Sequence, residues 1–209
     1  MTSNPDVKTL RSDPAYQLVN TLGFQGMVPF VKTQIKKRGL FSWLYFIVNL
    51  AMLAFILLIS IKGLADQTLT WKTVMVQTIS GILAGSLFII PIHELLHGLA
   101  YRILGARKII FGADLEQLIF FVTANSFPVS GKQVHLLTMT PFMIINLTTI
   151  AATVYLFPGG ILFSAFFLLS HNIMCIGDFA ISGYVASIAG TVYTFDEPES
   201  KISYFYKRV

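Results

Sequence analysis

Residues 73–98 read TVMVQTISGILAGSLFIIPIHELLHG, and the first twenty of them, from Thr73 to Ile92, carry no charged side chain. A helix of about 20 predominantly apolar residues is long enough to cross the hydrocarbon core of a bilayer, which is roughly 30 Å thick. The stretch therefore predicts a membrane-spanning helix, and His93 opens a polar cluster at its end.

Three other stretches have the same character. Phe41–Ile61 is twenty-one residues long and uncharged, Val134–Phe157 is also uncharged, and the stretch from Ile161 to about Ile188 contains one charged residue, Asp178. Over the whole chain 55% of residues are hydrophobic and 12% are charged, whereas soluble domains carry roughly 25% charged residues. We therefore expect an all-α membrane protein with four transmembrane helices.

These spans divide the chain into residues 1–40, a cytoplasmic and interfacial segment, residues 41–190, the four-span core, and residues 191–209, a cytoplasmic tail. Thirteen Lys and Arg residues fall on one side of the predicted membrane and two on the other, and the richer side is normally cytoplasmic. We expect a multi-pass protein of the cell membrane with both termini in the cytoplasm. Its net charge of +5 is explained by this orientation, so no nucleic-acid partner is expected.

Short segments outside the spans also have recognisable patterns. Val28–Ile35 is amphipathic and is followed by Lys36-Lys37-Arg38, which predicts an interfacial helix whose cations meet anionic lipid head groups. The connection from Gly105 to Gln133 is rich in β-branched and aromatic residues, which predicts short strands at the membrane's cytoplasmic edge. Residues Thr191–Tyr206 alternate in polarity and predict a hairpin between two strands.

The polar cluster contains an H-E-x-x-H motif formed by His93, Glu94 and His97. Four residues are about one helical turn, so the two imidazoles leave the same face of a helix and can bind one zinc ion, with the glutamate beside them to accept a proton from water. Ionisable groups inside a membrane are costly, and their presence indicates a function. The motif therefore predicts a catalytic zinc site.

A catalytic zinc usually takes three protein ligands, so one more is needed. The fourth stretch places His171, Cys175 and Asp178 on one face of a helix, because their intervals return to the same side. Counted along the helices, Asp178 lies at a depth similar to that of His93, and it is the favoured third ligand. The alternatives that remain are His171, Cys175, Asp114 and Glu116.

The segment from His93 to Gly105, followed by Ala106-Arg107-Lys108, resembles the motif helix and following turn of site-2 proteases, the intramembrane metalloproteases. It is also similar to a set of bacterial membrane proteins classed as putative zincin peptidases. The resemblance implies that His93, His97 and Asp178 bind zinc and that Glu94 is the general base. Around Asp178 the chain reads HNIMCIGDF, without the asparagine-proline and aspartate-glycine pairs of the site-2 family.

The function expected from these residues is a zinc-dependent endopeptidase that cleaves membrane-embedded or membrane-adjacent polypeptides. A helical substrate must be unwound before cleavage, and pairing with the predicted strand Leu118–Thr123 would hold it extended. The candidate substrate-binding residues are Phe120, Phe121, Val122, His171 and Asn172.

Two other functions fit parts of the sequence. An inactive zinc-binding scaffold that binds transmembrane helices would need the two histidines but not Glu94, so that glutamate distinguishes a scaffold from an enzyme. A channel or transporter is disfavoured, because the polar residues converge on one site and do not line a path across the bilayer.

Overall fold

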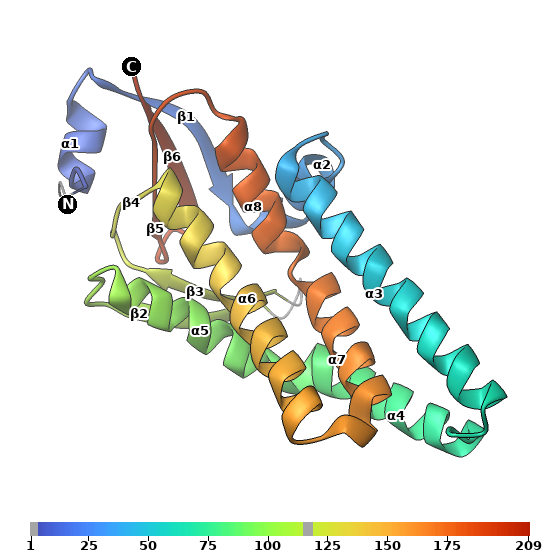
Figure 1. The fold of residues 1–209 in the computed structure, drawn as a ribbon. Helices are drawn as coiled ribbons and strands as arrows, with labels where there is room; N and C mark the ends of the chain where they lie inside the picture. The colour runs from blue at the N-terminus through green and yellow to red at the C-terminus, as the bar shows by residue number, and fades with distance from the viewer. Residues whose placement is uncertain (1–3, 115–118) are drawn as a thin grey trace. The chain divides into compact units, whose positions relative to one another are not determined.

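The structure is a computed structural model that describes residues 4–114 and 119–209, and it is mostly helical with two small antiparallel sheets (Figure 1). The chain divides into two compact units. Unit 1 comprises Met1–Ser42, Glu94–Thr140 and Asp178–Val209, and unit 2 comprises Trp43–His93 and Pro141–Gly177.

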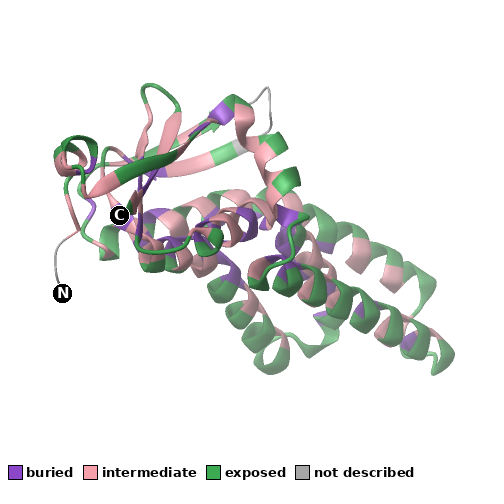
Figure 2. Ribbon diagram, turned by 90° about the horizontal axis from the view of Figure 1, so that it is seen from above, coloured by how far each residue is buried: buried purple, intermediate pink, exposed green. Residues whose placement is uncertain are grey.

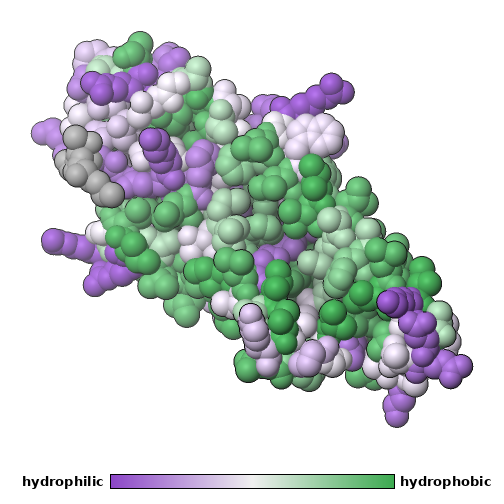
Figure 3. All heavy atoms as spheres, viewed as in Figure 1, coloured by the Kyte–Doolittle hydropathy of each residue, from purple (hydrophilic) through white to green (hydrophobic). Residues whose placement is uncertain are grey.

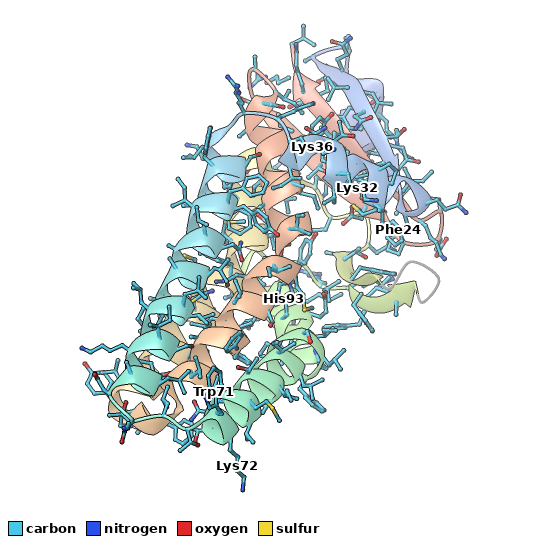
Figure 4. All side chains as sticks on the ribbon, turned by 90° about the vertical axis from the view of Figure 1, so that its right-hand side faces the viewer. Phe24, Lys32, Lys36, Trp71, Lys72 and His93 are labelled. Carbon is cyan, nitrogen blue, oxygen red and sulfur yellow. The ribbon has the colours of Figure 1, made fainter. Side chains whose placement is uncertain are left out.

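Unit 2 is built from apolar helices. Its elements are most of α3 (Leu40–Ala65), α4 (Trp71–Leu83), the π-helix η2 (Ala84–Phe88), the second part of α6 (Gly131–Tyr155), the short 3-10 helix η3 (Pro158–Gly160) and α7 (Ile161–Met174). Helix α4 begins where the Thr70 hydroxyl accepts a hydrogen bond of 3.1 Å from the Thr73 backbone N–H, as is common for a threonine N-cap. Figure 4 labels Trp71 and Lys72 at this start, with the lysine side chain extending away from the helices.

Small residues let α4 and η2 approach the backbone of α7. A Cβ atom added at Gly81 would lie 2.6 Å from the Phe163 carbonyl oxygen, and one added at Gly85 would collide with the Phe167 carbonyl. Helices in apolar surroundings pack closely through such small residues, because dispersion forces need short distances. Ile56 of α3 and Leu162 and Ala165 of α7 form a buried cluster in this unit.

Unit 1 contains both sheets. The larger has the strand order β1-β6-β5-β4, with β1 at Tyr16–Gly23, β6 at Ile202–Arg208, β5 at Val192–Glu197 and β4 at Val129–Ser130. The smaller pairs β2 (Ile109–Asp114) with β3 (Ile119–Ala124). All pairings in both sheets are antiparallel. The remaining elements are α1 (Val7–Ser12), the 3-10 helix η1 (Phe24–Gly26), α2 (Met27–Ile35), most of α5 (Ile90–Ile103) and of α8 (Ile176–Ser187), and the start of α6.

A hydrophobic core joins these strands to the helices of unit 1. Leu22 of β1, Ala100 of α5, Val185 of α8 and Phe205 of β6 are all buried in one cluster. Helix α5 also lies close to β2, because a Cβ atom at Gly98 would be 2.9 Å from the Phe111 ring. The helix that carries the H-E-x-x-H motif is therefore anchored on the strands along its C-terminal half.

The chain is mostly helical, as expected, and it also contains two small antiparallel sheets, of which the sequence predicted only some strands. The N-terminal segment forms helix α2 over the residues predicted to be helical, and it also supplies β1, which was not predicted and pairs with β6. The place of α2 at the membrane surface stays a prediction. The predicted hairpin of the C-terminal tail is confirmed as β5 and β6. The strands predicted in the connection from Gly105 to Gln133 are confirmed as β2 and β3, while Leu118, the predicted first residue of the second strand, lies outside the described residues.

Two helices in the described chain, α3 and α6, are each long and apolar enough to cross a membrane. Two more spans are reached only if each of two bent pairs is counted as one, namely Trp71–Phe88 with Ile90–Ile103 and Pro158–Met174 with Ile176–Ser187. The fourth predicted stretch is thus two helices, α7 and α8, and the expectation of one continuous helix there is wrong. The arrangement of four spans remains a prediction.

The exposed surface of the long helices is apolar. Only 11% of the most apolar window of α3 and 33% of that of α6 are buried, and Figure 2 shows exposed residues along the helices. In the space-filling view of Figure 3, hydrophobic residues cover the helices of unit 2, and hydrophilic residues gather over the loop between α3 and α4. An extended apolar surface of this kind is compatible with contact to lipid.

Candidate metal centre

Helix α5 carries the whole H-E-x-x-H motif (Figure 4 labels His93). Pro91 lies in its first turn, where a missing backbone N–H costs no helical hydrogen bond. The helix ends before Gly105, whose φ of +100° is a left-handed conformation that glycine adopts without strain. Because His93 and His97 are four residues apart within this one helix, their side chains leave it on the same side.

In unit 1 the imidazole of His97 is fixed by the backbone of α6. Its Nδ1 lies 3.0 Å from the carbonyl oxygen of Leu137. A carbonyl oxygen can only accept, so Nδ1 carries the proton and donates it, and in the neutral ring the lone pair is then on Nε2. A neutral imidazole binds a metal ion through the nitrogen that carries the lone pair, which in His97 is Nε2.

Asp178 lies next to that Nε2 atom. The distance from His97 Nε2 to Asp178 Oδ1 is 3.3 Å, and the two side chains are 14% and 13% exposed. Asp178 stands in the first turn of α8, where the partial positive charge of a helix N-terminus favours a carboxylate. Unit 1 therefore brings together the nitrogen of one motif histidine and the oxygen of the favoured third ligand.

In unit 2 the other motif histidine meets the end of α7. His93 Nδ1 lies 3.1 Å from His171 Nε2, and Cys175 Sγ lies 3.6 Å from the same His171 nitrogen. His171 and Cys175 have no exposed surface, and His93 is 8% exposed. One ligand atom from each of the three lies within 4.8 Å of the others, so His93, His171 and Cys175 are also a possible metal-binding group.

The residue beside His171 belongs to a buried amide pair. Asn146 Nδ2 donates to Asn172 Oδ1 at 2.7 Å, and Asn172 Nδ2 donates back to Asn146 Oδ1 at 3.2 Å. Asn172, like His171, has no exposed surface. The role of His171 and Asn172 in substrate binding stays a prediction.

The strand residues predicted to bind substrate lie in β3 of unit 1. Phe120 is 41% exposed, whereas the Phe121 ring packs edge-on against Phe24 with centroids 4.6 Å apart. Val122 pairs with Phe111 of β2, the one strand that is hydrogen-bonded to β3 in the described part of the chain.

The remaining alternatives for a third ligand differ in placement. Asp114 closes β2, while Glu116 lies outside the described residues. Cys175 lies between α7 and α8 and points to His171. The contact between His93 and His171 was not predicted from the sequence, although the placing of His171, Cys175 and Asp178 at helical intervals was a signal that this segment faces the motif.

Comparisons with known proteins agree with the motif. A family model described as "Putative zincin peptidase" matches residues 86–192, which is just over half of the 209 residues. No curated protein matches the chain, and no solved structure matches it. The matched segment starts ahead of His93 and runs past Asp178 to the first residue of β5, so it contains the motif helix and the partners of His93 and His97 described above. The chain belongs to this family of zincin-type peptidases.

Proposed function

We propose that the chain is a zinc-dependent endopeptidase of the membrane, with His93, His97 and Asp178 as the zinc ligands and Glu94 as the general base. Membership of a zincin family supports a zinc metallopeptidase. The observation that carries the assignment of ligands is the pair formed by His97 Nε2 and Asp178 Oδ1, 3.3 Å apart and mostly buried.

The donor atoms of this pair fit zinc. Zinc binds imidazole nitrogen and carboxylate oxygen at about 2.0–2.1 Å in a tetrahedral arrangement, so two of its ligand atoms lie about 3.3–3.4 Å apart. The distance between His97 Nε2 and Asp178 Oδ1 has this value. The hydrogen bond from His97 Nδ1 to the Leu137 carbonyl leaves the lone pair on the correct nitrogen. His93, one turn earlier on α5, supplies the third donor from the same side of the helix.

These residues would hold a zinc ion, which would supply a Lewis acid to polarise the scissile carbonyl and to make a water molecule more acidic. Glu94 accepts the proton of the attacking water and passes it to the leaving amine, as a general base and then a general acid. Its position next to His93 on α5 keeps it beside the ligands without making it one. The carboxylate of Asp178 offsets part of the divalent charge, which lowers the cost of holding the ion in an apolar environment.

The substrates in this proposal are polypeptides embedded in the membrane or lying beside it. The apolar helices α3 and α6 support a location in the bilayer, and the excess of Lys and Arg on one side supports cytoplasmic termini in the cell membrane. An extended peptide could add to β3, where main-chain hydrogen bonds hold it and the exposed Phe120 contacts its side chains.

Metal analysis and a cleavage assay on one set of proteins test this function. The full chain is purified in detergent beside His97→Ala, with co-expressed single-span membrane proteins as substrates. We expect zinc in the wild-type protein, cleavage by it, and loss of both in His97→Ala. Absence of zinc from the wild-type protein, or equal cleavage by the two, would contradict the proposal.

A further inference from the structure

The two motif histidines use their Nδ1 atoms in different ways. His97 Nδ1 donates to a backbone carbonyl, that of Leu137, in unit 1. His93 Nδ1 lies 3.1 Å from the Nε2 atom of another imidazole, His171, in unit 2. A histidine that binds a metal through Nε2 normally donates its Nδ1–H to a fixed acceptor, which sets both the tautomer and the direction of the ring.

We propose that His171 is the positioning residue for His93. The Nε2 atom of His171 accepts a hydrogen bond from the Nδ1–H group of His93. This bond keeps the lone pair of His93 on its own Nε2 and directs that atom toward the zinc. This inference rests on the proposed function, because it concerns a ligand of the proposed zinc. His171 does not itself bind the ion, since its Nε2 lone pair is used by His93.

The end of α7 is built to hold His171 in one place. The side chain has no exposed surface, and Cys175 Sγ lies 3.6 Å from its Nε2. The next residue, Asn172, is tied to Asn146 of α6 by two hydrogen bonds. The backbone carbonyl of the following residue, Ile173, accepts a 3.2 Å hydrogen bond from the Tyr45 hydroxyl of α3. Contacts from two other helices therefore fix the turn that carries the acceptor.

The alternative is that His171 and Cys175 are themselves ligands, together with His93. The 3.1 Å contact between His93 Nδ1 and His171 Nε2 is within the range of a hydrogen bond, and in that alternative no hydrogen bond would join these two nitrogens. In that alternative His93 would bind through Nδ1, and the one-turn spacing of His93 and His97 would lose its purpose. A positioning role for His171 accounts both for its contact with His93 and for the one-turn spacing of His93 and His97.

The test compares four variants of the full chain in detergent, which are two at His171, a control in α7 and Asp178→Ala. His171→Leu removes the acceptor and keeps an apolar volume, whereas His171→Gln keeps an acceptor oxygen near the position of Nε2. Ser164→Ala is the matched control, because Ser164 is also a buried polar residue of α7, 8% exposed, and its hydroxyl accepts a hydrogen bond from the Thr153 hydroxyl. Zinc affinity is measured by competition with a chelator, and the visible spectrum of the cobalt-loaded protein reports the ligand geometry.

We expect His171→Leu to weaken zinc binding about 10- to 100-fold and to alter the cobalt spectrum, as loss of such a partner typically does. His171→Gln should recover most of the affinity and the wild-type spectrum, and Ser164→Ala should match wild type. Wild-type affinity and spectrum in His171→Leu would overturn the positioning role alone. Equal and complete loss of metal in both His171 variants, with Asp178→Ala still loaded, would make His171 a ligand and overturn it too. A wild-type protein without zinc would overturn the proposed function and this inference together.

Discussion

Nε2 of His97 lies 3.3 Å from Oδ1 of Asp178, although the first belongs to α5 and the second to α8, in two separate sequence segments of unit 1. Both side chains are mostly buried. A buried histidine and a buried carboxylate at this distance either form an ion pair or share a cation. The zincin family of the chain favours the shared cation.

Replacing Asp178 should therefore remove the metal. We expect Asp178→Ala to lose most of its bound zinc and all cleavage, because two imidazoles alone bind zinc weakly. Asp66→Ala is the control, since Asp66 lies in the turn after α3. The measurement is the zinc content of the purified proteins. A zinc content equal to that of wild type in Asp178→Ala would show that another residue is the third ligand.

The exposed strand residue Phe120 offers a test of substrate binding. Phe120→Lys should raise KM for a peptide substrate, because the proposal has the Phe120 side chain contact the substrate. Its zinc content should be unchanged, because Phe120 is not one of the proposed zinc ligands. Leu18→Lys is the matched control, since Leu18 is 46% exposed on the edge strand β1. Steady-state kinetics on both variants decide the point, and an equal KM in Phe120→Lys and wild type would exclude this strand from the substrate site.

Gly85 tests the packing of η2 on α7. A methyl group there would collide with the Phe167 carbonyl, so Gly85→Ala should destabilise the protein by about 1–3 kcal/mol, as overpacking does. Gly159→Ala should have little effect, because no atom lies within 4 Å of its added Cβ. Thermal unfolding in detergent measures both, and equal stability of the two variants would mean that η2 and α7 are not packed this closely.

The sequence predicted the motif helix because the signal is local. The spacing of His93 and His97 fixes one face of one helix, and a long uncharged run before them fixes its surroundings. The pairing of Asp178 with the motif was expected from depth and from the resemblance to site-2 proteases, and the contact with His97 agrees with it.

The elements that the sequence did not predict depend on distant partners. Strand β1 exists because Tyr16–Gly23 pairs with β6 near the other end of the chain, and a local pattern does not contain that partner. No proline lies at the break between α7 and α8 at Cys175, so the sequence contains no strong helix-breaking residue there. Likewise, the acceptor for His97 is the backbone carbonyl of Leu137. Because every residue has such a carbonyl, the sequence does not indicate which one accepts this hydrogen bond.

Orientation in the membrane is a separate prediction. With Cys175, the one cysteine of the chain, replaced by alanine, a new cysteine at Ser130 should be protected from an impermeant reagent added outside the cell, and one at Asp66 should react. The reason is the excess of Lys and Arg on the side that contains Ser130. The reverse labelling pattern would invert the proposed topology.

Glu94→Gln tests the assignment of the general base. The substitution removes the proton acceptor and leaves His93, His97 and Asp178 unchanged, so we expect a zinc content equal to that of wild type and no detectable cleavage. Zinc content and cleavage are measured on the same preparation. Cleavage at the wild-type rate by zinc-loaded Glu94→Gln would contradict the assigned mechanism, and loss of zinc from it would show that Glu94 is a ligand and not the base.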